Sequence, residues 1–248
     1  MIKAVTFDFW STLYRGRTPK YTERLLSLKA AVEEGSDARF ELAAFEAALK
    51  AARRAWNRAW VDEHRTIGAP EWLSILTAEL GVSLRPRARA AIEAGLENTV
   101  LQDLPTLAPG LVPVLADLSA RYRLAIISDT GLTPGRVLRQ VLAHDNVFDY
   151  FSHCTFSDEL GRSKPHADAF LSTLAALNAK PQQAVHVGDT LRTDIAGAQN
   201  VGMRAVQYVG LNHDDYPGVT PDAVIHSHTE LASWLNRWNG NSPKPPPG

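Results

Sequence analysis

Three short apolar segments, each ending in or closely followed by an acidic or hydroxyl side chain, constrain the fold of this chain more than any other feature. Residues 2–8, 124–127 and 184–187 are mostly apolar and of strand length. Farther along the chain, strand-like and helix-like segments alternate, with a loop expected over 157–164 and a helix over 194–201. Strands that alternate with helices form a parallel sheet with helices on both faces. The sequence therefore predicts an α/β fold built on a doubly wound parallel sheet.

Residues 15–103 differ from the rest of the chain in composition. They are rich in Ala, Leu, Arg and Glu and poor in β-branched residues, and their apolar side chains recur at helical spacing. We expect an all-helical domain over 15–103, inserted into a core formed by residues 1–14 and 104–241. The last residues, 242–248, include four prolines and are expected to form a disordered tail.

Three tryptophans lie in the helical insert. Trp56 and Trp60 are four residues apart, so they share one face of a helix, and Trp72 follows in the next predicted helix. Aromatic side chains at this spacing usually pack in a core or an interface. We interpret the three as packing residues, some of which could also line a cleft against the core.

The bulk composition excludes several classes of function. The formal net charge of the 248 residues is −1, which gives no electrostatic basis for binding nucleic acid or an anionic membrane. Cys154 is the only cysteine, as is typical of a reducing compartment. The first strand begins at residue 2, which leaves no room for a signal peptide, and no apolar run approaches the ~20 residues that span a bilayer. We expect a cytoplasmic protein; its oligomeric state is not readable from the sequence.

Charged side chains follow the predicted strands and should meet in one crevice, where ligands bind in doubly wound sheets. An aspartate can attack phosphorus and form an aspartyl-phosphate, so Asp8 is a candidate nucleophile. Asp189 and Asp194 could join Asp8 in binding magnesium, which prefers oxygen ligands. Lys164 would neutralise Asp8 and the transferred group, and Ser128 could bind phosphoryl oxygens. The set predicts phosphoryl transfer to a carboxylate.

At four segments the sequence resembles the haloacid dehalogenase-like (HAD) hydrolase superfamily. The segments are Phe7–Leu13, Ile126–Asp129, Gly161–Pro165 and Gly188–Asp194, in this order along the chain. The resemblance implies a Rossmann-like core with a helical cap inserted after the first strand. It also implies a hydrolase that acts on a small phosphorylated molecule with the help of Mg²⁺.

The same resemblance implies a role for each site residue. Asp8 would be the catalytic nucleophile, and Lys164 would act beside it. Ser128 and Lys164 would bind the phosphoryl group, and we expect Thr12 and Asp129 beside them as further candidates for binding the substrate or its phosphate. The magnesium ligands would be the carboxylates of Asp8, Asp189 and Asp194 and the backbone carbonyl of Trp10.

Trp10 departs from the pattern of the family's phosphatases. These enzymes usually carry a second Asp at this position, which protonates the leaving group and then activates water. An indole cannot perform general acid–base catalysis, which typically contributes ~10²–10⁴-fold to the rate. Either the leaving group needs little protonation, as in an acyl or aryl phosphate, or another group supplies the proton, or turnover is slow.

Two further functions stay open beside the phosphatase. The family's 2-haloacid dehalogenases attack carbon with the same Asp, form an aspartyl ester, and often carry an aromatic residue at the position of Trp10. They use no metal and usually have Ser-Ser-Asn where this chain has Val187, Gly188 and Asp189. Because neighbouring acids repel one another without a cation, Asp189 and Asp194 favour the phosphatase. The other alternative is a weakly active or non-catalytic protein that binds a phosphoryl ligand.

Overall fold

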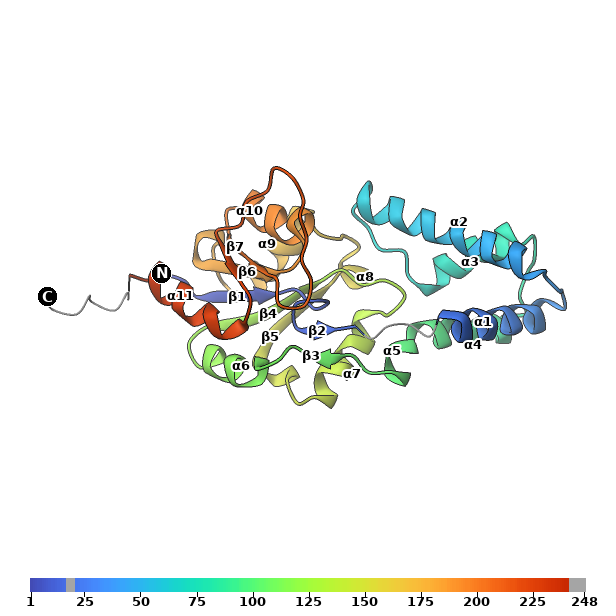
Figure 1. Ribbon diagram of the computed structural model, residues 1–248, viewed down its shortest axis with the longest axis horizontal. Helices are drawn as coiled ribbons and strands as arrows, with labels where there is room; N and C mark the ends of the chain where they lie inside the picture. The colour runs from blue at the N-terminus through green and yellow to red at the C-terminus, as the bar shows by residue number, and fades with distance from the viewer. Residues whose placement is uncertain (17–20, 241–248) are drawn as a thin grey trace, which may run out of the picture.

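A six-stranded parallel sheet forms the centre of the larger lobe of the molecule (Figure 1), in a computed structural model that describes residues 1–16 and 21–240. The strand order is β5-β4-β1-β6-β7-β8, so β1 lies in the middle and the order reverses on either side of it. The α/β prediction with a doubly wound sheet is confirmed. The strands are β1 (Ala4–Phe7), β4 (Arg123–Ser128), β5 (Phe151–Phe156), β6 (Ala184–Gly188), β7 (Arg204–Tyr208) and β8 (Ala223–Ile225).

Helices cover both faces of this sheet because side chains alternate between the faces along each strand. Val5 and Phe7 of β1 belong to an apolar cluster with α6, α7 and α11, whereas Ala4 belongs to a cluster with α9 and α10. Each face of the sheet therefore has its own apolar interface with the helices that cover it. The bounds are α6 (Leu111–Ser119), α7 (Gly135–His144), α9 (Ala167–Ala176), α10 (Ala196–Asn200) and α11 (Leu231–Trp238).

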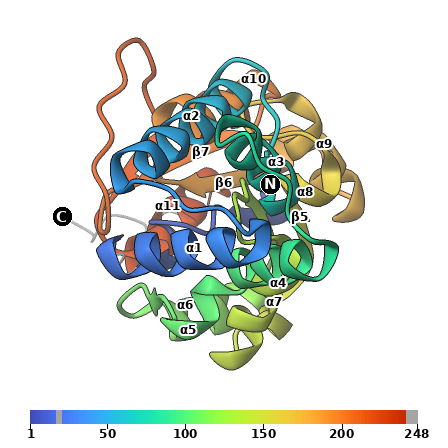
Figure 2. The same ribbon diagram turned by 90° about the vertical axis from the view of Figure 1, so that its right-hand side faces the viewer.

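A helical lobe is inserted between β1 and β4, where the sequence predicts the cap. Figure 2 shows its helices lying over one end of the sheet. Phe45, Leu73 and Leu76 are fully buried in an apolar cluster that belongs to this lobe. The helices are α1 (Tyr21–Ser36), α2 (Leu42–Val61), α3 (Ala69–Glu79) and α4 (Pro86–Glu97), followed by the short α5 (Thr99–Gln102).

A two-stranded antiparallel sheet marks the place where the chain leaves the core and returns to it. It pairs β2 (Tyr14–Arg15) with β3 (Thr106–Leu107). The expected domain limits, 14/15 and 103/104, fall close to this small sheet, and the division into domains stays a prediction. The expected disordered tail, 242–248, lies outside the described residues.

Two segments near the site differ from the expected secondary structure. A short helix, α8 (Ser157–Leu160), lies in the expected loop. The segment expected as one helix from Asp194 instead begins as a π-helical turn, η3 (Leu191–Ile195), that leads into α10. Such turns are rare and occur frequently at functional sites.

Three 3₁₀ turns complete the core: η1 (Phe148–Tyr150), η2 (Pro181–Gln183) and η4 (His228–Glu230). In residues 1–16 and 21–240, we find no helix with both the length and the apolar character needed to cross a bilayer.

Candidate active site

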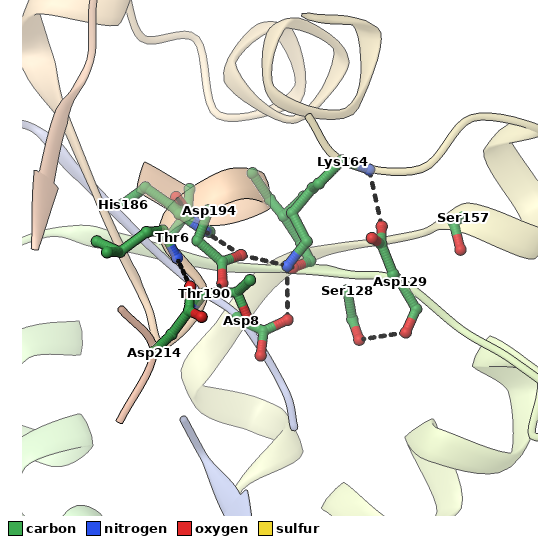
Figure 3. Close-up of polar contacts among 12 residues, drawn as sticks. Thr6, Asp8, Ser128, Asp129, Ser157, Lys164, His186, Thr190, Asp194 and Asp214 are labelled. Carbon is green, nitrogen blue, oxygen red and sulfur yellow. Dashed lines mark hydrogen bonds and ion pairs between the residues drawn. The ribbon is translucent and has the colours of Figure 1, made fainter. Parts of the chain in front are cut away.

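The predicted catalytic residues converge at the carboxyl end of the sheet (Figure 3). Asp8 follows β1, Asp189 follows β6, and Lys164 comes from the loop between α8 and α9. Asp194 lies in η3, directly after β6. Because the strand order reverses at β1, the crevice forms where ligands bind in doubly wound sheets. All four side chains are buried.

Lys164 is the centre of this cluster. Its Nζ lies 2.6 Å from Asp8 Oδ1, 2.6 Å from Asp194 Oδ1 and 3.0 Å from the carbonyl oxygen of Ile127. An ammonium group has three N–H donors, so these contacts account for all of them. The lysine therefore fixes two carboxylates with respect to each other and to the end of β4.

Asp194 is held in place from several sides. Thr190 N donates to its Oδ2 at 2.9 Å, and Nε2 of the buried His186 lies 3.3 Å from Oδ1. Gly188 leaves room for the carboxylate, because a Cβ at that position would lie 2.3 Å from Asp194 Cγ. His186 Nδ1 in turn lies 2.8 Å from Thr6 Oγ1, so this histidine orients a site residue from within the core.

The charges of the cluster do not balance. Burial raises the pKa of Asp8 well above its ordinary value, and Asp194 and Asp189 add to that shift against the opposing charge of Lys164. Burial and Asp194 raise the pKa of Asp189 to about 6. Burial alone would also raise the pKa of Asp194, but Lys164 and His186 hold it below its usual range. One ammonium thus faces three carboxylates, which leaves excess negative charge.

The three carboxylates form a set that fits a divalent metal ion. Ligand oxygens of Asp8, Asp189 and Asp194 lie within 4.8 Å of one another. Hard cations such as Mg²⁺ prefer carboxylate oxygens, and a divalent charge would compensate the excess that Lys164 leaves. The part of the backbone carbonyl of Trp10 as a further ligand stays a prediction.

Trp10 lies in a tight turn that follows β1. Tyr14 N donates to Phe9 O at 2.9 Å and Ser11 N to Tyr14 O at 2.7 Å, while Ser11 has a left-handed φ of 56°. A non-glycine residue in this conformation is uncommon, and such residues cluster at active sites. The turn places Trp10 in the lining of the pocket, with its indole edge-on to the ring of Phe9.

A pocket of about 500 Å³ opens above the cluster. Asp8, Lys164, Asp189 and Asp194 form its charged floor, and two cap residues, Trp56 and Trp60, are part of its wall. We name these two parts the floor and the cap wall. The possibility that insert tryptophans line a cleft is confirmed for Trp56 and Trp60, whereas Trp72 is buried in the apolar cluster of the cap.

Of the four residues predicted to bind the phosphoryl group, only two line the pocket. Asp129 and Lys164 line the pocket, whereas Ser128 and Thr12 are buried and are not among its lining residues. Asp129 Oδ1 accepts a hydrogen bond from Lys164 N at 2.8 Å, and its Oδ2 accepts one from Trp60 Nε1 at 2.7 Å. Burial raises the pKa of Asp129. The phosphoryl-binding roles of these residues stay predictions.

The cap is seated on the core beside the lysine loop. Ser163 N, which precedes Lys164, donates to the carbonyl oxygen of His64 at 2.7 Å. Thr66 Oγ1 lies 2.5 Å from Ser157 Oγ and 3.2 Å from Ser163 Oγ. The segment that joins α2 to α3 therefore contacts the segment that carries Lys164.

Sequence reasoning missed several residues that support the site. Asn212 Nδ2 donates to Asp189 Oδ2 at 2.7 Å, and Asp214 Oδ2 accepts from Leu191 N at 2.7 Å. Both come from the loop after β7, where a run of polar residues was the only available signal. Arg192, in η3, faces the cap, and its guanidinium lies 4.6 Å from the ring centre of Trp60.

The doubly wound parallel sheet and the charged floor at its carboxyl end agree with the family that the four sequence segments resemble. The chain belongs to the haloacid dehalogenase-like hydrolases, whose family model matches residues 2–202.

Similar proteins include phosphatases and a dehalogenase. A glyceraldehyde 3-phosphate phosphatase of Pyrococcus furiosus is 32% identical over 180 residues, which cover 69% of this chain and 72% of that enzyme. A 2-haloacid dehalogenase from Pseudomonas syringae pv. Tomato DC3000 superposes with a TM-score of 0.67 at 25% identity, covering 96% of this chain and 100% of that one. An HAD phosphatase from Thermococcus onnurineus gives 0.66 at 24% identity, covering 97% and 99%. The resemblance inferred from the sequence is confirmed.

Proposed function

We propose that this hydrolase is a magnesium-dependent phosphatase of small phosphorylated molecules that acts through an aspartyl-phosphate on Asp8. The observation that carries the proposal is the charge of the floor, where three buried carboxylates lie close together and one ammonium pairs with two of them. The similar protein from Pyrococcus furiosus is named as a phosphatase, which supports the same class of reaction.

Each floor residue has a distinct task in this reaction. Asp8 attacks phosphorus with a carboxylate oxygen, and the bond between phosphorus and the leaving oxygen breaks. Lys164, already bonded to Asp8 Oδ1, holds the nucleophile in position and faces the charge that develops on the phosphoryl oxygens. Asp8, Asp189 and Asp194 would hold a magnesium ion, which supplies positive charge between the anionic nucleophile and the anionic phosphate when bound.

The second half of the reaction returns Asp8 to its carboxylate form. Water supplies the oxygen that displaces Asp8 from phosphorus, and inorganic phosphate leaves. Trp10 offers no carboxylate to activate this water, so we expect turnover to be slower than in relatives that carry an acid at this position, where general acid–base catalysis typically contributes ~10²–10⁴-fold.

Dehalogenation is the second candidate, because Trp10 is aromatic and a 2-haloacid dehalogenase is similar over nearly the whole chain. Gly188 counts against it. Those dehalogenases usually carry Ser at this position, and here a Cβ would lie 2.3 Å from Asp194 Cγ. In this chain the Asp194 carboxylate thus occupies the space that a serine side chain at position 188 would need.

The test compares Asp8→Asn with the unmodified protein. Phosphate release from acetyl phosphate is measured with magnesium and with EDTA, and halide release from 2-chloropropionate is measured in parallel. We expect phosphate release that EDTA abolishes and that Asp8→Asn lowers by about 10³-fold or more, since an amide is not a nucleophile. Halide release that is unaffected by EDTA would instead establish the dehalogenase.

A further inference from the structure

The cap contributes only two residues to the lining of the pocket among the residues that the structure describes, and both are tryptophans. Trp56 and Trp60 stack on each other on α2, with ring centres 5.6 Å apart and ring planes at 24°. Trp10 adds a third indole from the core side. The part of a substrate that lies beyond its phosphoryl group therefore meets aromatic surface.

Trp60 is held rigidly in this cap wall. Its Nε1 donates to Asp129 Oδ2 at 2.7 Å, the guanidinium of Arg192 lies 4.6 Å from its ring centre, and Trp56 stacks against it. A fixed aromatic side chain loses little conformational entropy when a ligand binds. Such a wall suits a flat ligand group that gains from contact with indole rings.

Among the described residues, the lining of the pocket also lacks a second positive charge that could pair with another anionic group. Within residues 1–16 and 21–240, Lys164 is the only lysine or arginine in the lining, and its three contacts are Asp8, Asp194 and the carbonyl of Ile127. A leaving group that carried a carboxylate or a second phosphate would be buried next to indoles without a counter-charge, which is costly. The pocket thus favours an uncharged leaving group.

The absence of an acid at position 10 points in the same direction. A phenolic oxygen has a pKa of about 10, as in tyrosine, and can leave as the anion far more readily than an alkoxide. An aryl phosphate therefore needs little protonation of its leaving group. The residue that makes phosphatase chemistry harder for alkyl esters, Trp10, also extends the aromatic surface of the pocket.

We propose that the substrates are monophosphate esters of uncharged phenols, with the ring seated between Trp10 and the cap wall. This inference rests on the proposed phosphatase function. Asp8 forms a bond to phosphorus while the bond from phosphorus to the aryl oxygen breaks, and the phenolate leaves with the electron pair. Water then displaces Asp8 from phosphorus. One proton of this water stays with the phosphate and the other balances the proton that the phenolate takes up, so the products are phenol and inorganic phosphate.

The experiment measures kcat/KM for 1-naphthyl phosphate, acetyl phosphate and phosphoglycolate with magnesium, in the unmodified chain and in Trp56→Leu. Acetyl phosphate has a good leaving group without a ring, and phosphoglycolate has a carboxylate. We expect 1-naphthyl phosphate to exceed phosphoglycolate in the unmodified chain. In Trp56→Leu, we expect the ratio of 1-naphthyl phosphate to acetyl phosphate to fall about tenfold, through KM, because a stacking contact is lost. Trp56→Phe should restore most of it.

The matched control is Tyr21→Leu, which removes an exposed aromatic residue from another cap helix and should keep the unmodified ratio. Preference for phosphoglycolate, or an unchanged ratio in folded Trp56→Leu, would overturn the aromatic substrate class while leaving the phosphatase intact. If acetyl phosphate itself is not hydrolysed, the proposed function fails. Titration calorimetry of 1-naphthyl phosphate into Asp8→Asn, with and without Trp56→Leu, then tests the substrate class alone: about tenfold weaker binding supports it and equal binding overturns it.

Discussion

The floor and the cap wall of the pocket differ in how their side chains are held. On the floor, Lys164 ties Asp8 and Asp194 together in a buried, charged cluster at the ends of the central strands. On the cap wall, Trp56 and Trp60 present aromatic surface from the inserted helix α2. Trp60 contacts the core at Asp129, which lies 69 positions later in the sequence. If the floor carries the proposed chemistry and the cap wall the proposed substrate selection, we expect mutations to be able to affect one without the other.

Lys164→Met should have the largest effect, because it removes the only positive charge from the floor. We expect phosphate release to fall by about 10³-fold or more. We also expect the free energy of unfolding to fall by about 3 kcal/mol or more, since breaking a buried ion pair leaves an uncompensated charge. Phosphate assays and urea unfolding would measure the two effects.

The control for this prediction is Lys50→Met, which removes an exposed lysine from α2 and should leave both quantities unchanged. A Lys164→Met protein with unmodified activity would show that Lys164 takes no part in the chemistry. Loss of stability without loss of activity would reduce the lysine to a structural residue.

Trp10→Asp tests whether the missing acid at position 10 limits the reaction on the floor. We expect turnover of an alkyl ester such as glycerol 3-phosphate to rise about 10²-fold, because the new carboxylate can protonate the leaving oxygen. Turnover of 1-naphthyl phosphate should rise less, since its leaving group needs less help. Steady-state assays of both esters would check this. Equal gains for the two would locate the limiting step in the attack of water on the aspartyl-phosphate.

Part of the floor could be predicted from the sequence because the order of the strands brings the residues at their carboxyl ends together. Asp8 and Asp189 follow β1 and β6, which are neighbours in the sheet, so their proximity follows from a doubly wound topology. Lys164 comes from a loop of the core, and its Nζ contacts the carbonyl oxygen of Ile127 in β4. Asp194 was placed correctly although the helix around it was not, because a π-helical turn still points it at the end of β6.

The cap wall could not be predicted in the same way. Helical periodicity showed that Trp56 and Trp60 share a face, but not which surface that face meets. Their contact with Asp129 depends on how the cap docks on the core, for example through Ser163 and the carbonyl oxygen of His64, and no sequence spacing encodes that docking. Asn212 was missed for a related reason, since an irregular loop carries no periodicity that could place its side chain beside Asp189.

Trp60→Phe should have the smallest effect, and it isolates the hydrogen bond that joins the cap wall to the floor. Phenylalanine keeps an aromatic ring but cannot donate to Asp129 Oδ2. This hydrogen bond contributes about 1 kcal/mol to holding the cap wall against the half-buried Asp129, and losing that amount from the substrate-binding arrangement corresponds to roughly fivefold in affinity. We therefore expect KM for 1-naphthyl phosphate to rise about fivefold, with kcat nearly unchanged because the floor is intact.

Hydrogen exchange gives this last prediction a second measurement. If the bond from Trp60 to Asp129 holds the cap on the core, amides in residues 60–66 should exchange faster in Trp60→Phe, because Thr66 and His64 contact the core in the same region. Trp234→Phe, which removes an indole N–H from α11, should leave both KM and exchange in residues 60–66 unchanged. A rise in KM without faster exchange would mean that Trp60 acts on the substrate directly, and that the cap is held by the contacts of Thr66 and His64 alone.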